Sequence, residues 1–363
     1  MAGGGEEAKG EVGEAGIASG EGAETPVGSV DVLIVSLGST GGLRRADEEL
    51  AGSLRRAGAS VAIVAATSPR RVRTLALTDL MWALAARRAA RAELNRRKPR
   101  AVIYSSTTAA LFWPRPGAIR FDASAAGNRP GRDGVWQRPL ESHRLRQAPL
   151  LLPWSESGLR EAPQMAVQGG RALVLPVPVE PSGPTGPPGQ VRDIAAVTYG
   201  ANPTKKGLDR VLAAWRAVRR PGEELVVMGA PASDPSTGSS LPTEGGVRSV
   251  GMLPYDEYRA LLRRARVFVC APRREDYGIA QLEALADGCE LVTTSAPGPY
   301  AALPIARALD ERLVGNDLAS ALRTALDDPT PDYSARALDA LVPFRREAVD
   351  RMVAKRLLPR LLA

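Results

Sequence analysis

The chain has 363 residues with a formal net charge of +8, and 44% of the residues are hydrophobic. This length and apolar content predict about two domains with complete cores. No apolar run approaches the roughly 20 residues that cross a bilayer, and the N-terminus lacks the basic and apolar regions of a signal peptide. We therefore expect neither a membrane span nor a secretory leader. Residues 1–29 are rich in Gly, Ala and Glu and are expected to form a disordered tail.

The first half alternates short apolar runs with longer segments rich in Ala and Arg. This alternation predicts strands and helices in a doubly wound parallel sheet. Ser155 follows the fifth apolar run and is placed to cap a helix. The expected strands are residues 30–36, 61–64, 101–104, 118–121, 150–152 and 171–176, and the expected helices are residues 43–57 and 78–96.

A proline- and glycine-rich stretch, PSGPTGPPG, lies within residues 176–190 and is the clearest linker in the chain. A second alternation of strands and helices follows it. The expected strands are residues 193–198, 224–228, 248–251, 265–270 and 290–293, and the expected helices are residues 208–219, 256–264, 279–287, 317–326, 333–341 and 344–362. Two Rossmann-like halves joined by this hinge predict a cleft between two domains.

The two cysteines, Cys270 and Cys289, do not have the spacing of metal ligands. We expect both to be free and buried, as in a reducing cytoplasm. The pI near 9.8 admits nucleic acid, an anionic membrane or phosphorylated substrates as partners, and an Arg-rich composition explains it equally well. The densest basic segment, from Arg87 to Lys98, is expected on a helix. A solvated face is the default interpretation of this segment, and contact with anionic lipid is the alternative.

Glu275 and Glu283 are the most informative pair of residues. Glu275 follows the expected strand 265–270, in a loop with Tyr277 and Gly278, and Glu283 lies on the helix that begins at Ile279. Ligands of open α/β sheets collect beyond the carboxyl ends of the strands, and the amides at a helix start favour an anion. Two carboxylates there suit the hydroxyls of a sugar and a ribose. A helix whose N-terminal acid pairs with the macrodipole is the structural alternative.

This segment resembles the E-x7-E signature of retaining GT-B glycosyltransferases of the large GT4-like family. The resemblance implies that Glu275 lies near the donor sugar and that Glu283 binds the ribose. It also implies donor contacts from Tyr277, Gly278 and Ile279. The similarity extends roughly over residues 30 to 345 and is strongest at 265–293.

The segment from Tyr199 to Leu208 resembles the family's G-R-L-x-x-x-K-G stretch, in which Arg and Lys neutralise the donor diphosphate. Gly200 and Lys206 match that pattern, but Ala201 stands at the Arg position. A single cation leaves a diphosphate undercompensated in a partly desolvated cleft. Lys205, Asn202 or Arg210 could substitute. A basic helix terminus in solvent is the alternative interpretation.

The glycines Gly38, Gly41 and Gly42 follow the first strand without forming the dinucleotide pattern G-x-G-x-x-G, and no acid follows the second strand. This argues against an NAD oxidoreductase. The resemblance places Gly41 and Gly42 at the donor diphosphate, although a plain tight turn explains them as well.

Asp122 stands where the family commonly carries a His that lines the donor-sugar pocket. Its carboxylate could bind donor hydroxyls or the acceptor, or it could cap the next loop. The following residues, 127–138, combine loop formers with an aromatic and guanidinium groups. We interpret them as an acceptor-binding segment, with loop packing as the alternative.

The only histidine, His143, lies on an expected basic helix. A lone histidine there is expected to be structural or exposed, and it argues against a Ser-His-Asp hydrolase and a metal centre. No G-x-x-x-x-G-K-[ST] sequence is present, which argues against a P-loop kinase. We expect no metal and no cofactor.

The sequence therefore predicts an α/β protein with two Rossmann-like domains facing a cleft, as in the GT-B fold. We expect an acceptor domain over residues 30–178, a linker over 179–192, a nucleotide-sugar domain over 193–345 and a helix over 346–363 that packs back on the first domain. The predicted activity is that of a retaining hexosyltransferase. Its catalytic residues would be Glu275, Asp122 and Lys206, and its partner a nucleotide-sugar donor. A non-catalytic nucleotide-sugar-binding or scaffold protein is the alternative. We expect no nucleic acid partner and a cytoplasmic location, with contact to the inner face of the membrane left open.

Overall fold

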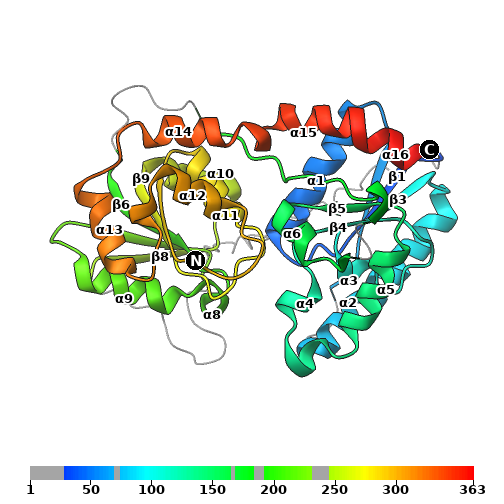
Figure 1. Cartoon of the computed structure of the whole chain (residues 1–363), viewed down its shortest axis with the longest axis horizontal. Coiled ribbons are helices and arrows are strands. Elements are labelled where there is room, and N and C mark those ends of the chain that lie inside the picture. The colour runs from blue at the N-terminus through cyan, green and yellow to red at the C-terminus, as the bar shows by residue number, and fades with distance from the viewer. Residues whose placement is uncertain (1–27, 69–73, 165–167, 184–191, 231–244) are drawn as a thin grey trace, which may run out of the picture.

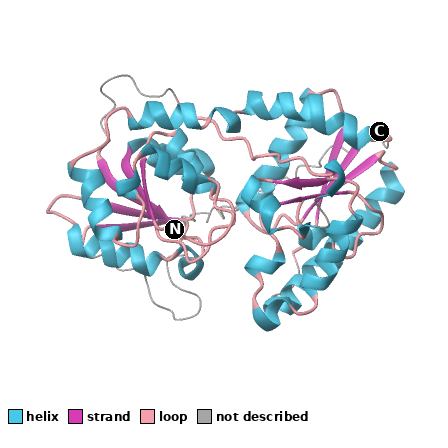
Figure 2. Cartoon of the chain, in the orientation of Figure 1, coloured by secondary structure: helices cyan, strands magenta, loops and turns pink. Residues whose placement is uncertain are grey.

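The computed structural model describes residues 28–68, 74–164, 168–183, 192–230 and 245–363. Two lobes lie side by side, each built on a five-stranded parallel sheet (Figure 1). Helices cover both faces of each sheet (Figure 2). This confirms the predicted pair of doubly wound domains. Most of the predicted tail and residues 184–191 of the predicted linker lie outside the described residues.

The first sheet has the strand order β2-β1-β3-β4-β5. Its central strands are buried along their whole length, as expected for a parallel sheet with helices on both faces. The strands are β1 Val32–Ser36, β2 Val61–Ala65, β3 Ala101–Tyr104, β4 Ala118–Phe121 and β5 Leu151–Pro153. The helices of this domain are α1 Gly41–Arg56, α2 Leu75–Arg97, α3 Thr107–Ala110, α4 Ala125–Asn128, α5 Gln137–Gln147 and α6 Glu156–Glu161, with short 3-10 turns at Gly131–Gly134 and Gln168–Gly170.

The second sheet has the order β10-β9-β6-β7-β8. Its strands are β6 Ile194–Tyr199, β7 Leu225–Met228, β8 Val247–Gly251, β9 Ala265–Cys270 and β10 Glu290–Thr293. Its helices are α8 Pro203–Lys206, α9 Leu208–Val218, α10 Tyr255–Arg264, α11 Ile279–Ala286, α12 Ala302–Leu309, α13 Leu318–Asp327 and α14 Tyr333–Ala340, with 3-10 turns at Glu311–Leu313 and Val342–Phe344.

The chain returns to the first domain at its C-terminal end. The continuous helix of α15 Arg346–Met352, a π-helical turn Val353–Leu357 and α16 Leu358–Leu362 crosses from the second lobe to the first (Figure 1). Val349, Val353 and Leu357 join the same buried cluster as β1. The Arg56 guanidinium of α1 contacts the Asp350 carboxylate at 2.6 Å.

The predicted strand over residues 171–176 is wrong. The segment pairs with the sheet only through a bridge between Leu151 and Ala172 and a few backbone hydrogen bonds. In one of these the Leu175 amide donates to the Pro153 carbonyl oxygen. Pro176 ends the run and has no amide hydrogen to continue a ladder. The segment therefore leads from the edge of the sheet into the hinge.

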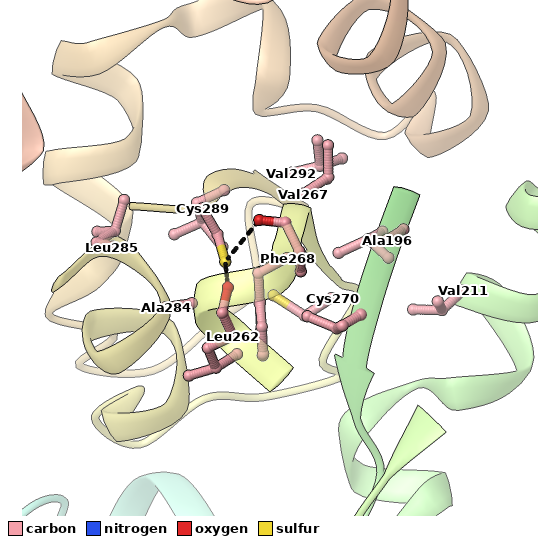
Figure 3. Close-up of a cluster of buried hydrophobic side chains, with 14 of the residues drawn as sticks. Ala196, Val211, Leu262, Val267, Phe268, Cys270, Ala284, Leu285, Cys289 and Val292 are labelled. Atoms are coloured by element: carbon pink, nitrogen blue, oxygen red, sulfur yellow. Dashed lines mark hydrogen bonds between the residues drawn. The ribbon is translucent and has the colours of Figure 1, made fainter. Parts of the chain in front are cut away.

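Both cysteines are free and buried, as predicted. Cys289 lies between α11 and β10 in the core of the second domain, where its thiol donates to the Leu262 carbonyl oxygen at 3.1 Å (Figure 3). Burial raises the pKa of the Cys289 thiol to about 12. Both cysteines belong to the apolar cluster around β9, so they act as packing residues.

Candidate functional site

The site forms where β6 and β9 end beside each other at the carboxyl edge of the second sheet. Glu275 lies in the loop between β9 and α11 and is only 4% exposed. Its Oε2 accepts hydrogen bonds from the Lys206 ammonium at 2.7 Å and from the Gln281 side-chain amide at 3.1 Å. Lys206 ends α8, which follows β6. Two loops thus bring one carboxylate and one cation together at a buried position.

Gly207 makes this approach possible. It has a φ of +63°, and a Cβ at this position would lie 1.9 Å from the Ala271 carbonyl oxygen. Only glycine tolerates both the left-handed conformation and the close backbone contact. The Arg273 amide also donates to the Lys205 carbonyl oxygen at 2.9 Å. The loops after β6 and β9 are therefore joined along their backbones as well as through Lys206.

A second ion pair lies next to the first. The Lys205 ammonium contacts the Asp276 carboxylate, and Arg274 Nε donates to Asp276 Oδ1 at 2.9 Å. Burial raises the pKa of Asp276, but the two cations outweigh burial and hold that pKa below its ordinary value. The Arg274 guanidinium also reaches the first domain, where it bonds both oxygens of Glu161 at 2.7 and 2.9 Å.

Asp122 approaches the site from the first domain, in the loop after β4. Its pKa is raised to about 6, mainly because of burial and secondly because of the Asp276 charge. Its Oδ1 accepts the Ala123 amide at 2.8 Å. Asp122 is therefore close enough to the seam between the domains for the charge of Asp276 to act on it.

Glu283 lies on α11 and is 6% exposed. Its two oxygens accept hydrogen bonds from the hydroxyls of Tyr255 at 2.7 Å and Tyr258 at 3.0 Å. Burial raises the pKa of Glu283, and the charges of Arg259 and Arg45 act in the opposite direction. Arg45 belongs to α1 of the first domain, and its guanidinium lies over the Tyr255 ring, 3.0 Å from the centroid.

The start of α11 faces the start of α1 across the seam. Gly278 has a φ of +90° directly before α11, and a Cβ there would lie 2.9 Å from the Tyr300 ring. A Cβ added at Gly42 would lie 3.6 Å from the side chain of Ile279. The predicted donor-binding residues Gly42, Gly278 and Ile279 are thus brought together.

Tyr277 is buried at the hinge. Its hydroxyl oxygen accepts the Val177 amide at 3.1 Å, and its ring meets the edge of Trp154 with centroids 5.1 Å apart. This position gives Tyr277 a role in joining the hinge to the site loop.

Gly41 and Gly200 lie at opposite ends of the exposure range. Gly41 is exposed, with open space around it. Gly200 is buried, and its amide donates to the Met228 carbonyl oxygen at 2.8 Å. Gly200 therefore continues the β6–β7 pairing just before α8.

Two of the three residues named as substitutes for the missing arginine already have partners. Asn202 caps α8 by accepting the Lys205 amide at 3.0 Å, and Lys205 is paired with Asp276. Arg210 lines a hollow of about 700 Å³ between α9, α13 and the loops after β9 and β10, whose lining includes neither Glu275 nor Glu283. Ala201 is exposed.

The sequence analysis did not identify the residues that contact Glu283 and Arg274 from other elements. Tyr255 and Tyr258 lie on a separate helix from Glu283, and Arg45 and Glu161 lie in the other domain. No local spacing signals such contacts. Asp276 was adjacent to Glu275 in the sequence, and its charged neighbours Arg274 and Lys205 were the available sign of a second ion pair.

His143 is exposed on α5. Within the described residues, no group of three or more His, Cys, Asp or Glu side chains is arranged to hold a metal ion. No helix in the described ranges combines the length and the apolar character needed to cross a bilayer.

Residues 193–328 match the family model described as Glycosyl transferases group 1. This segment contains most of the second domain, including Lys205, Lys206, Glu275, Asp276 and Glu283. The comparison with curated proteins found no match.

Solved structures with the same two-domain arrangement are glycosyltransferases of the GT-B fold, which this chain shares. Anabaena Alr3699/HepE in complex with UDP-glucose superposes with a TM-score of 0.65 at 13% identity, over 90% of this chain and 99% of that chain. WaaG, a glycosyltransferase involved in lipopolysaccharide biosynthesis, gives 0.63 at 14% identity over 91% and 97%. Sucrose-phosphate synthase from Thermosynechococcus elongatus gives 0.60 at 17% identity over 89% and 97%. At these sequence identities the structural similarity establishes the fold alone.

Proposed function

We propose that this protein is a retaining glycosyltransferase of the GT4-like type that moves a hexosyl group from a nucleotide-sugar donor to an acceptor. The observation that carries the proposal is the buried contact between Lys206 and Glu275 at the carboxyl ends of β6 and β9. It lies inside the segment that matches the glycosyl transferases group 1 model. A cation and a carboxylate at this position suit the diphosphate and the sugar hydroxyls of one donor.

The donor would lie along the start of α11. Its diphosphate would meet the free amides of the first helical turn, which favour an anion, together with the Lys206 ammonium. Glu275 would bind the sugar hydroxyls, and Glu283 would bind the ribose. HepE has been solved with UDP-glucose, and a nucleotide-sugar donor for this chain is consistent with that precedent.

The existing ion pairs would affect how the donor diphosphate binds. Lys206 and Lys205 are each paired with a carboxylate in this structure. A donor diphosphate would compete with Glu275 for the Lys206 ammonium. The Glu275 carboxylate would then be free to bind the sugar hydroxyls. The absent arginine at Ala201 leaves a cation deficit. Arg45 of the first domain carries a guanidinium whose charge acts on Glu283 across the seam.

The chemistry would be substitution on one face of the anomeric carbon, with the leaving diphosphate helping to deprotonate the acceptor. The protein would then act by positioning and by stabilising the negative charge that develops on the phosphate. Lys206 and the amides at Gly278 and Ile279 would supply that stabilisation. Asp122, facing the seam, would orient a hydroxyl of the donor or the acceptor.

A calorimetric screen of UDP-, GDP-, ADP- and dTDP-sugars tests the proposal. At least one donor is expected to bind, and Lys206→Ala should weaken that binding about tenfold or more, since a charge-assisted contact contributes roughly 1.5–3 kcal/mol. Lys355→Ala, on the C-terminal helix, serves as the control. No binding of any donor to the wild-type protein would reject the proposal.

A non-catalytic nucleotide-sugar-binding protein on the same fold is the second candidate. Ala201 favours it, because a diphosphate leaving group would receive less charge compensation. Transfer and donor hydrolysis assays with the donor identified above separate the two candidates. Binding without transfer or hydrolysis across a broad acceptor panel would select the binding protein.

We also propose that the protein touches an anionic membrane surface through α2. Leu77, Met81 and Leu84 are 48, 38 and 44% exposed, and their spacing places them on one helix face. The exposed Arg88 and Arg91 continue that face. Apolar and basic side chains together fit the boundary of an anionic bilayer.

Vesicle flotation tests the membrane contact. Binding is expected with phosphatidylglycerol vesicles and not with phosphatidylcholine vesicles, and added salt should weaken it. The double variant Met81→Glu and Leu84→Glu should abolish it while donor binding persists. Equal flotation of the variant and the wild type would reject this contact.

A further inference from the structure

The two oxygens of the Glu275 carboxylate are in different environments. Oε2 accepts hydrogen bonds from the Lys206 ammonium at 2.7 Å and from the Gln281 side-chain amide at 3.1 Å. Oε1 receives no hydrogen bond from any described residue, and it is not one of the fully buried atoms that lack a partner. The protein therefore holds Glu275 by one oxygen and leaves the other oxygen open to a ligand.

The orientation of the Gln281 amide is set by its surroundings. Gln281 lies in the first turn of α11 and is 2% exposed. Its Nε2 lies between Glu275 Oε2 and the Cys270 sulfur, which is 3.7 Å away, and its Oε1 lies beside the backbone of Gly278. If the amide were turned around, its oxygen would meet the Glu275 carboxylate, and two acceptors repel each other. The donating end of Gln281 therefore faces Glu275.

A chain of polar side chains lies behind Gln281 in a core that is otherwise apolar (Figure 3). The Cys270 thiol approaches the hydroxyl oxygens of Thr293 at 3.3 Å and Tyr300 at 3.5 Å, and these two oxygens are 2.9 Å apart. All three side chains are buried. Buried polar groups are costly unless they are bonded to each other, and a connected set fixes one arrangement. This chain keeps Gln281 in its place beside Glu275.

The backbone of Glu275 is fixed separately, by the loop after β10. The Glu275 amide donates to the Pro297 carbonyl oxygen at 3.0 Å. Gly298 has a φ of +112°, and a Cβ at this position would overlap the Glu275 carbonyl oxygen. The backbone of Glu275 is therefore held, and the direction of its carboxylate depends on the two side chains that bond to Oε2.

These two side chains would act differently when a donor binds. Under the proposed function, the diphosphate competes with Glu275 for the Lys206 ammonium. Gln281 is neutral, so a diphosphate does not attract it in the same way. Gln281 would then be the donor that continues to hold Oε2. Because an amide carries no net charge, it also leaves the charge of the carboxylate available to the sugar hydroxyls.

We propose that Gln281 is a positioning residue for the transfer reaction. Its amide holds Oε2 of Glu275 while a donor is bound, and it thereby keeps Oε1 in place for the sugar hydroxyls. This inference rests on the proposed glycosyltransferase function. It assigns a role to a residue for which the E-x7-E resemblance supplies none.

Steady-state kinetics of Gln281→Met test the proposal. Methionine keeps the length and the packing of the side chain but donates no hydrogen bond. The probes are UDP-, GDP-, ADP- and dTDP-glucose, and the assay measures the nucleoside diphosphate released. Turnover is expected to fall about 10-fold, while the donor KM stays within about threefold, because the affected contact orients the sugar and does not hold the nucleotide.

A double-mutant cycle distinguishes positioning from a general structural effect. In the Glu275→Ala background, Gln281→Met should change turnover by less than about twofold, because its effect passes through Glu275. Equal losses in the two backgrounds would overturn the proposal. Tyr333→Phe is the matched control, since it removes another buried hydrogen bond of the same domain, with the Leu291 amide at 3.1 Å. It should lower the unfolding temperature and leave turnover unchanged, and a loss of turnover like that of Gln281→Met would also contradict the proposal.

Crystal structures without donor separate this inference from the proposed function. In Lys206→Ala the Glu275 carboxylate should keep its orientation, because Gln281 still holds Oε2. In the double variant Lys206→Ala and Gln281→Met it should adopt more than one orientation. A single, unchanged orientation in the double variant would show that Gln281 does not position Glu275, even if donors bind and react. If none of the four donors binds to the wild type, the proposed function fails, whatever the orientation of Glu275 in these structures.

Discussion

The two domains bring different chemistry to the same seam. In the second domain, Lys206 with Glu275 and Lys205 with Asp276 form ion pairs within the domain itself. In the first domain, Asp122 and Arg45 meet their counterparts only across the seam. The second domain is therefore expected to recognise a donor alone, whereas groups of the first domain act only when the domains meet. Substitutions in the second domain should have the larger effects.

Glu275→Ala is the strongest test of this contrast. It removes the carboxylate that we propose orients the sugar, and it leaves the partly buried Lys206 without its partner. We expect turnover to fall by roughly 100-fold to 1000-fold, a loss typical of one preorganised electrostatic contact in an active site, with a smaller change in donor affinity. Steady-state kinetics and donor calorimetry together measure the two effects.

Glu224→Ala is the matched control, because Glu224 lies in the same domain in an exposed pair with Arg248. Exposed pairs contribute little, so its activity should equal that of the wild type. If Glu275→Ala also retains full turnover, the proposed role of the second domain is wrong.

Glu283→Ala should act mainly on donor affinity. The substitution removes the proposed ribose contact and leaves the hydroxyls of Tyr255 and Tyr258 without their acceptor. We expect the donor dissociation constant to rise by about 10-fold to 100-fold, as for a lost charged hydrogen bond of roughly 1.5–3 kcal/mol, with turnover at saturation less affected. Calorimetry gives the affinity.

Tyr258→Phe provides a graded comparison with Glu283→Ala. It removes one hydroxyl contact but leaves the carboxylate in place, so donor affinity should fall by less. An equal loss in both variants would indicate that the tyrosine hydroxyl, and not Glu283, carries the donor contact.

The difference between the domains also explains what the sequence could predict. In the second domain the apolar runs of β9 and β10 are short, buried and ended by turn residues, and their predicted bounds agree with the structure. The predicted bounds of β3 and β4 agree for the same reason. The edge segment at 171–176 had the same apolar pattern but joins the sheet only through one bridge and a few backbone hydrogen bonds. The apolar pattern does not distinguish an edge segment from a full strand, because a full strand also needs regular hydrogen bonding to an adjacent strand.

The candidate site was predictable only where its residues are close in sequence. The spacing of Glu275 and Glu283 places one on the loop and the other on the following helix, and the structure has them there. Their partners could not be found in this way. Tyr258 lies 25 residues before Glu283, and Arg274 reaches Glu161 over 113 residues. Such contacts depend on the packing of whole elements.

Asp122→Asn tests the first-domain side through stability. Burial and the charge of Asp276 raise the pKa of Asp122 from 3.8 to about 6, so the folded protein binds a proton more tightly than the unfolded chain. Stability therefore falls as pH rises from 3.8 to about 6 and stays lower above that. Asn carries no charge, so the variant should be more stable than wild type by about 1–2 kcal/mol well above that range, after allowance for partial exposure.

Denaturant unfolding at several pH values measures this difference, which should shrink towards zero as pH approaches 3.8. Transfer activity should fall in the same variant if Asp122 orients a substrate hydroxyl. A stability difference that is independent of pH would show that Asp122 does not carry the raised pKa.

The pair between Arg274 and Glu161 should give the smallest effect, because it links the domains without touching the proposed donor position. Both side chains are partly buried, at 19 and 24% exposed. Arg274→Ala also removes the contact with Asp276, so the single variant loses two contacts. A double-mutant cycle with Glu161→Ala isolates the interaction energy between Arg274 and Glu161. We expect a coupling of about 0.5–1 kcal/mol in kcat/KM.

The pair between Arg56 and Asp350 lies away from the site loops and should give no coupling in the same assay. Zero coupling for Arg274 and Glu161 would mean that their contact does not contribute to the proposed transfer reaction. The first domain would then influence transfer only through groups such as Asp122 that face the donor loop directly.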